Sequence, residues 1–195
     1  MPPLSAATKL FPDYNESFPR CPSKLHRMQD FEPIFADDGY RPNVGIVICN
    51  ANGQVFWARR IKRDGWQFPQ GGVGQNESLT DAMFRELQEE TGLTRSQVRL
   101  IAHTKRWLHY DLPDHFLRNQ NLDSGSKVSF KGQKQIWFLL EFLADDSVVD
   151  LQTGIETPEF DSWKWVEPNF ALNNIVSFKR PVYKKALSEL SPYLP

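Results

Sequence analysis

The chain contains little cysteine and no long apolar run. Cys21 and Cys49 are the only cysteines among 195 residues, which excludes a disulfide framework and a cysteine zinc site. No stretch reaches the roughly 18 apolar residues that a membrane-spanning helix needs, and no apolar signal core follows a basic flank. We therefore expect neither membrane insertion nor export, and the scarcity of cysteine favours a reducing cytoplasm.

Net charge is also nearly absent. The 23 basic and 24 acidic residues leave a formal charge of −1, which excludes a protein that coats nucleic acid through a broad positive field. Any contact with nucleic acid must therefore be local. With 40% hydrophobic and 24% charged residues, the composition is that of a globular protein, and at about 150 residues per domain it predicts one domain.

Proline is concentrated near the N-terminus. Six of the 14 prolines fall within residues 1–38, where no helical or strand periodicity is sustained. We expect an irregular extension over residues 1–36 and a folded domain over residues 37–195. The extension either follows the surface through its aromatic side chains or is a disordered tail, and the sequence does not decide between the two.

Strands alternate with helices in the remaining residues. A β-branched run at 44–49, a turn signal and a second run at 55–58 predict a hairpin. Residues 66–69 predict a short strand leading into a glycine-rich loop at 71–74, and further strands are expected at 98–102, 105–110, 136–142 and 163–166, with a polar insertion at 111–126. A helix is expected from Ser78, as N-cap, to Thr91, before Gly92, and a last helix opens with Ser177 as N-cap and Pro181 in its first turn. This order predicts an α/β fold in which a mixed sheet lies between helical layers (α/β/α).

The helix at 78–91 carries carboxylates where a purely structural helix would not. Glu86, Glu89 and Glu90 share one half of the helical wheel with the apolar stripe, repel one another, and lie near the C-terminal end, where the helix dipole disfavours negative charge. Clustered hard oxygen ligands suit Mg²⁺, the first expectation, or Mn²⁺. The alternative is a solvated acidic face in which Arg85 pairs with Glu89. The glycine-rich loop just before the helix favours the metal site.

The same residues complete a known motif. Nine positions resemble the Nudix box, the signature of a hydrolase family: Gly71, Glu77, Arg85, Glu86, Leu87, Glu89, Glu90, Gly92 and Leu93. Segments flanking the box are similar to those of the bacterial RNA 5′-pyrophosphohydrolases of this family: GYRPNV from Gly39, WQFPQGG from Trp66, GQKQ from Gly132, TPEFD from Thr157 and VSFKR from Val176. The resemblance covers roughly residues 37–190 and implies the Nudix fold.

The resemblance implies an activity and a set of site residues. The activity is metal-dependent removal of pyrophosphate from the 5′-triphosphate end of RNA, leaving a 5′-monophosphate and so initiating mRNA decay. Metal ligands would be Glu86, Glu89, Glu90 and Glu159, with a weaker contribution from the Gly71 carbonyl. The general base is left open among Glu89, Glu90 and Glu159.

Further residues receive roles from the resemblance. Glu77 and Arg85 would form a structural brace that holds the loop against the helix. The first nucleotides of the RNA would be held by Arg41, Arg60, Val176, Phe178 and Lys179, with Lys134 and Tyr110 in the same cleft. For Arg41 and Arg60 the alternative is ordinary surface charge, for Phe178 it is packing at the start of the helix, and for Tyr110 it is a place in the core.

Two other functions stay open. Relatives that hydrolyse dinucleoside polyphosphates such as diadenosine tetraphosphate share the same box, so a nucleoside polyphosphate is the alternative substrate. A non-catalytic Nudix module that binds nucleotides ranks third, because such modules usually lose a box carboxylate and this chain keeps all of them. Protein partners are not indicated by the sequence.

Overall fold

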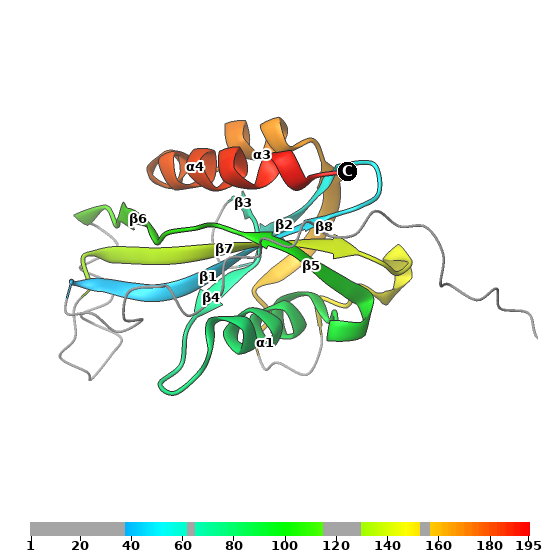
Figure 1. Cartoon of the computed structure of the whole chain (residues 1–195), viewed down its shortest axis with the longest axis horizontal. Coiled ribbons are helices and arrows are strands. Elements are labelled where there is room, and N and C mark those ends of the chain that lie inside the picture. The colour runs from blue at the N-terminus through cyan, green and yellow to red at the C-terminus, as the bar shows by residue number, and fades with distance from the viewer. Residues whose placement is uncertain (1–37, 62–64, 115–129, 153–156) are drawn as a thin grey trace, which may run out of the picture.

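A computed structural model describes residues 38–61, 65–114, 130–152 and 157–195 (Figure 1). The expected extension at 1–36 and most of the polar insertion at 111–126 lie outside the described residues, and the domain boundary at residue 37 stays a prediction. No helix among the described residues is long and apolar enough to cross a membrane.

The centre of the fold is a mixed eight-stranded sheet. The long central strands β1 (Tyr40–Cys49) and β7 (Gly132–Phe142) run parallel, with Tyr40 opposite Gly132 and Cys49 opposite Glu141. On one side of this pair lie β2 (Val55–Arg60), β3 (Trp66–Gln67), β4 (Gln70–Gly72) and β8 (Phe160–Val166), and on the other lie β5 (Val98–His103) and β6 (Leu108–Asp111). All pairs other than β1–β7 are antiparallel.

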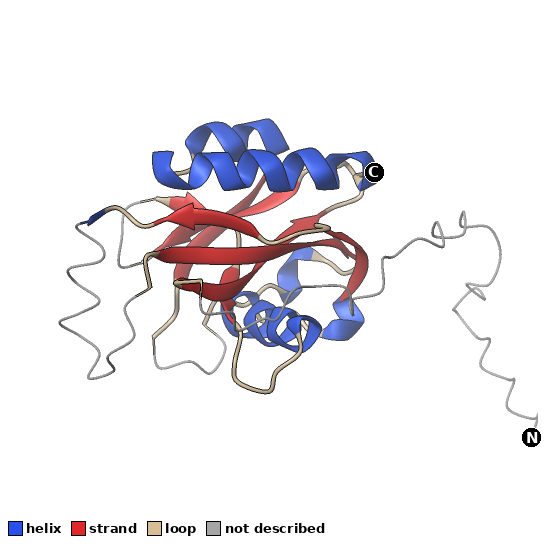
Figure 2. Cartoon of the chain, turned by 60° about the vertical axis from the view of Figure 1, so that its left-hand side comes forward, coloured by secondary structure: helices blue, strands red, loops and turns tan. Residues whose placement is uncertain are grey.

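Helices cover both faces of the sheet. In Figures 1 and 2, α1 (Leu79–Thr91) lies on one face, while α3 (Pro168–Asn174) and α4 (Arg180–Leu190) lie together on the other. Each face has its own apolar core: Met83 and Leu87 of α1 pack on one side, and Tyr183 and Leu190 of α4 pack on the other. The predicted α/β/α architecture is confirmed.

The ends of α1 follow the local sequence closely. The Ser78 hydroxyl accepts a hydrogen bond from the Asp81 backbone N–H at 3.1 Å, as expected of an N-cap. Gly92 ends the helix with φ +72°, a left-handed conformation that costs glycine little. The predicted helix is therefore confirmed at both ends.

Three expectations about local structure are wrong. The prediction omits α3, although Pro168 stands in its first turn, where a missing N–H costs nothing. Ser177 begins a 3₁₀ turn, and Lys179 rather than Ser177 is the N-cap of α4. Gly71 and Gly72 belong to β4 and pair with Val44 and Asn43 of β1, so the first half of the expected glycine loop is a strand.

Candidate active site

The Glu86 side chain packs against β4 at Gly71, where the absence of a side chain leaves room for the carboxyl group. Helix α1 lies against β4 and β1, and Glu86 is 9% exposed on this inner side. A Cβ atom at Gly71 would lie 1.7 Å from the Glu86 carboxyl carbon, so any larger residue at that position would displace the Glu86 carboxyl group. Burial raises the pKa of Glu86, although the neighbouring Arg85 guanidinium opposes this shift.

Glu90 lies one turn further along α1 and also faces β4. The Gln70 backbone N–H donates a hydrogen bond of 2.9 Å to its Oε2. Burial raises the pKa of Glu90 well above its usual value, and the negative charges of Glu86 and Glu159 raise it further. Three of the predicted metal ligands are therefore close enough to influence one another electrostatically.

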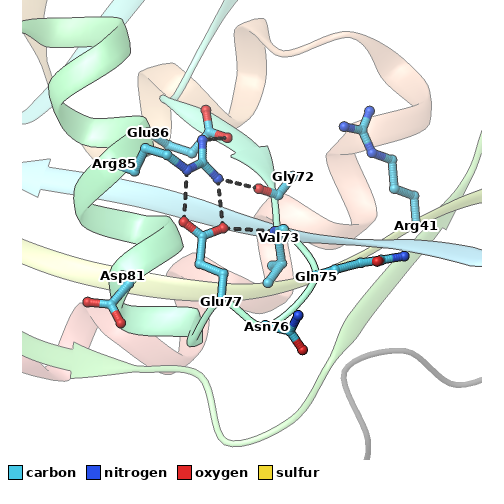
Figure 3. Close-up of a pocket in the computed structure, with 10 residues that line it drawn as sticks. Arg41, Gly72, Val73, Gln75, Asn76, Glu77, Asp81, Arg85 and Glu86 are labelled. Atoms are coloured by element: carbon cyan, nitrogen blue, oxygen red, sulfur yellow. Dashed lines mark hydrogen bonds and ion pairs between the residues drawn. The ribbon is translucent and has the colours of Figure 1, made fainter.

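Arg85 connects the turn before α1 to the carboxylates (Figure 3). Its Nε and Nη2 donate to the two oxygens of Glu77 at 2.8 and 2.9 Å, and Nη2 also donates to the Gly72 carbonyl at 2.8 Å. Its Nη1 donates to Glu86 at 2.7 Å and to Glu89 at 3.2 Å. The hydrogen bonds from Arg85 to Glu77 lower the pKa of Glu77.

The Glu77–Arg85 pair is less buried than a fully enclosed brace. The side chains are 18% and 37% exposed, so solvent weakens the interaction, and the loss of one partner costs less than in a dry interior. Arg85 also forms the bond to Glu89 that the solvated-face alternative expected. The two sequence-based interpretations of Arg85 are thus compatible in one structure.

Glu159, the predicted ligand outside the box, is held by a predicted RNA contact. Arg60 Nε and Nη2 lie 2.7 and 2.6 Å from Glu159 Oε1. Because Arg85 likewise binds Glu86 and Glu89, three of the four predicted metal-binding glutamates are bonded to arginines. Within the described ranges, no three acidic, histidine or cysteine side chains are close enough to form a metal site together.

Arg41 lies near the arginine–carboxylate network without bonding to it. It lines a cavity of about 620 Å³ with the chain from Gly72 to Glu77 and with Asp81, Arg85 and Glu86. Figure 3 shows its guanidinium well separated from the Glu77–Arg85 pair, with Gly72 and Val73 between them in this view. In the described part of the chain, Arg41 forms no ion pair. A positively charged side chain therefore borders the cavity next to Glu86.

A second set of predicted contacts gathers on the far side of β4. Lys179 is 7% exposed, and its ammonium donates to the side-chain carbonyls of Gln67 and Gln70 at 3.1 and 3.2 Å. Phe178 contacts the Tyr110 ring at a centroid distance of 5.9 Å, and Val176 is 38% exposed. Burial raises the pKa of Tyr110, whose hydroxyl donates to Gln133.

Lys134 stands apart from these residues. Its ammonium is 2% exposed, forms an ion pair of 2.8 Å with Asp38, and lies 5.2 Å from the centre of the Trp107 ring. A lysine buried in this way supports the start of β1 in this structure. A role in substrate binding stays a prediction.

Gln70 is the contact that the sequence analysis missed. Its backbone N–H binds Glu90, while its side-chain carbonyl accepts from Lys179 and, at 3.3 Å, from Gln135. One residue of β4 therefore touches both the acidic and the basic parts of the site. The only signal in the sequence is its position directly before the glycine pair.

Comparison with known proteins gives this site a family. A family model described as the NUDIX domain matches residues 39–186. An RNA pyrophosphohydrolase of Hydrogenovibrio crunogenus is 52% identical over 157 residues, covering 80% of this chain and 92% of that protein. The RNA pyrophosphohydrolase of Photobacterium profundum is 53% identical over 154 residues, covering 79% and 85% respectively.

Solved structures agree with this fold. An Ap4A hydrolase of C. elegans superimposes with a TM-score of 0.55 at 20% identity, covering 78% of this chain and 99% of that one. The E. coli dihydroneopterin triphosphate pyrophosphohydrolase superimposes with a TM-score of 0.58 at 20% identity, covering 75% and 95%. At such low identity these likenesses bear on the fold alone. The match over most of the chain, the half-identical relatives and the packing of the box helix against Gly71 together show that the chain belongs to the Nudix family.

Proposed function

We propose that this chain removes pyrophosphate from the 5′-triphosphate end of RNA and leaves a 5′-monophosphate. The observation that carries the proposal is the half-identity, over four fifths of the chain, to proteins named RNA pyrophosphohydrolase. The site chemistry supports it, because the buried Glu86 carboxylate on α1 and the guanidinium of Arg41 border one cavity. By this activity the protein initiates mRNA decay, and its location is the cytoplasm.

Nudix hydrolases generally need a divalent metal ion, and the carboxylates on α1 are oxygen donors of the type that such an ion prefers, although in this structure Glu86 and Glu89 are bonded to Arg85 and Glu159 to Arg60. Glu90 is desolvated beside the negative charges of Glu86 and Glu159, an arrangement that a cation relieves. Glu86, Glu89, Glu90, Glu159 and the Gly71 carbonyl would hold Mg²⁺ in the first place, or Mn²⁺. When bound, the metal neutralises polyphosphate charge and lowers the pKa of an attacking water.

The remaining steps belong to the side chains of this protein. Arg41 binds the phosphate chain, because its guanidinium borders the cavity and has no carboxylate partner among the described residues. Arg60 exchanges Glu159 for a substrate phosphate, and Lys179, Phe178 and Val176 hold the first nucleotides. Arg85 keeps the turn before α1 fixed through its bonds to Glu77 and Gly72.

The test compares two substrates in the presence of Mg²⁺. We expect kcat/KM for a 5′-triphosphorylated RNA to exceed that for diadenosine tetraphosphate. A clear preference for the dinucleotide would instead assign the chain to the dinucleoside polyphosphate hydrolases. Hydrolysis of neither substrate, with binding of both retained, would indicate a nucleotide-binding module.

A further inference from the structure

Three side chains form an exposed cation–aromatic cluster that the proposed site does not use. The Lys164 ammonium lies 4.5 Å from the centre of the Trp66 ring and 4.9 Å from the centre of the Phe170 ring. Phe170 is 43% exposed, Lys164 is exposed and Trp66 is half-buried. In the described part of the chain no carboxylate forms an ion pair with Lys164, so its charge is directed at two ring faces. We call these three residues the Lys164 surface.

The Lys164 surface joins three elements at one edge of the fold. Trp66 begins β3, Phe170 belongs to α3, and Lys164 lies on β8, which pairs with β2 alone among the described strands. Lys164 is opposite Trp57 in the β2–β8 register, and Trp57 belongs to the core beneath α4. Lys164 therefore projects from the sheet face that α3 and α4 cover (Figures 1 and 2).

This surface continues from the residues expected to hold the first nucleotides. Gly65, next to Trp66, approaches Val176, whose Cγ1 would lie 3.8 Å from a Cβ at position 65. In the other direction, Lys164 follows Glu159 by five residues, or roughly 16 Å at the rise of a β-strand. Lys164 is thus too far from the carboxylates to contact the reacting phosphates, while Trp66, at the other end of the surface, follows the residue that approaches Val176.

We propose that the Lys164 surface binds the single-stranded RNA that follows the first two nucleotides, an inference that rests on the proposed function. Exposed aromatic rings beside a lysine are the combination that binds single strands, because rings stack on any base and the ammonium binds phosphate. A stable protein interface would cover about 800 Å² on each partner, far more than three side chains offer. One nucleotide is enough to cover this cluster.

The cluster changes its partners when RNA binds. Without RNA, Lys164 covers the Trp66 and Phe170 rings through weak cation–π contacts. With RNA, a base stacks on the exposed Phe170 ring, and the Lys164 ammonium turns to the adjacent phosphate. The substrate is therefore recognised as an RNA chain with an unpaired 5′ segment and not as an isolated triphosphate.

The test compares substrates of two lengths in Mg²⁺: a 5′-triphosphorylated dinucleotide and an unstructured 5′-triphosphorylated hexanucleotide. We expect Phe170→Ala to lower kcat/KM for the hexanucleotide about tenfold and to leave the dinucleotide unchanged. Phe170→Tyr, which keeps a stacking ring, should retain wild-type values. For Lys164→Ala, the slope of log KM for the hexanucleotide against log salt concentration should fall by about 0.7, the value for one phosphate contact on a single strand.

Arg99→Ala is the control, because Arg99 lies on β5 at the opposite edge of the sheet and is paired with Glu141 and not with a residue that lines the cavity. This variant should leave kcat/KM unchanged for both substrates. An equal loss of kcat/KM for the dinucleotide and the hexanucleotide in Phe170→Ala, or no loss for either, would overturn the proposed role of the Lys164 surface. The proposed function would still stand. A wild-type enzyme that hydrolyses neither RNA would overturn the proposed function and this inference together.

Discussion

The two sides of strand β4 handle buried charge in opposite ways. On the α1 side the charges are negative, and Glu86 and Glu159 are bonded to the arginines Arg85 and Arg60. On the other side the buried charge is the positive Lys179, whose bonds run to the neutral side-chain amides of Gln67 and Gln70. Gln70 touches both sides, through its backbone N–H to Glu90 and through its side chain to Lys179.

The two sides therefore differ in whether the hydrogen-bond partners of the buried charged groups can be exchanged. Arg60, 24% exposed on its side chain, can leave Glu159 for water or for a phosphate, which frees the carboxylate for a cation. The amides around Lys179 are part of β3 and of β4, so this ammonium keeps its position, and its positive charge opposes the rise in the pKa of Glu90. We therefore propose that the acidic side takes up the metal ion and that the basic side meets the RNA end.

The largest expected effect comes from the acidic side. Glu90→Gln removes a charge but keeps the shape and leaves an acceptor for the Gln70 N–H, so the fold should be retained. We expect kcat to fall by about 100-fold or more, within the range for loss of a group that holds a metal or moves a proton. Steady-state kinetics checks this, and circular dichroism checks the fold.

The matched control is Glu189→Gln, the same chemical change on α4, far from β4 in the sequence. It should leave kcat unchanged. Near-wild-type turnover of Glu90→Gln with a normal spectrum would contradict the division between an acidic catalytic side and a basic binding side.

The next effect tests the contact between α1 and β4. Gly71→Ala places a methyl group where the Glu86 carboxyl lies, 1.7 Å from its carbon, so this buried carboxyl group must leave its position and its bond to Arg85, or helix and strand must separate. We expect a loss of about 1 to 3 kcal/mol in the free energy of unfolding and a large fall in kcat. Denaturant unfolding and kinetics measure the two effects.

Gly74→Ala is its control within the same turn. A Cβ there meets Glu77 Oε2 at 3.1 Å, an atom at the end of a flexible side chain. This variant should be only slightly destabilised. Equal losses in the two variants would mean that Glu86 is not the reason for glycine at position 71.

A smaller effect is expected from the cation that borders the cavity. Arg41→Ala should raise KM for triphosphorylated RNA about tenfold, the loss of one charged hydrogen-bonded contact, with kcat little changed. Arg59→Ala, which breaks an exposed pair with Asp161, is the control and should leave KM unchanged. An unaltered KM in Arg41→Ala would remove this residue from the nucleotide site.

The smallest effect is a dependence of stability on pH. Burial raises the pKa of Glu90 above its ordinary 4.5, so the folded protein holds a proton that the unfolded chain releases. Its contribution to stability is complete below pH 4.5 and is lost as pH rises through the folded pKa. Metal-free Glu90→Gln should therefore have a higher Tm than the wild type at neutral pH and an equal Tm below pH 4.5, as measured by calorimetry in chelator. A Tm difference that is constant with pH would contradict this assignment.

The sequence predicts most reliably where the determining contacts are local. Ser78 and Gly92 cap α1 through bonds within a few residues of each end, so both helix ends could be predicted. Helix α3 is only seven residues long, so the proline at its start is a weaker sequence signal than the helical periodicity of a longer helix. Strand β4 looks like a loop because its glycines carry no strand propensity, and its pairing with β1 depends on residues far away in the chain.

The same division holds for the site. The box glutamates lie within one helix, so their shared face follows from helical geometry alone. The bond from Arg60 to Glu159 joins residues 99 positions apart, and only the register of β2 with β8 brings them together. Burial of Lys179 and Lys134 is likewise a tertiary property, because a lysine in a sequence predicts solvent exposure.

The most direct test of the account is the identification of products from a 5′-triphosphorylated RNA by mass spectrometry, with and without Mg²⁺. The account predicts a 5′-monophosphorylated RNA and pyrophosphate, formed only when the divalent metal is present. An unchanged triphosphate in the presence of Mg²⁺, or a product formed equally well in chelator, would contradict it.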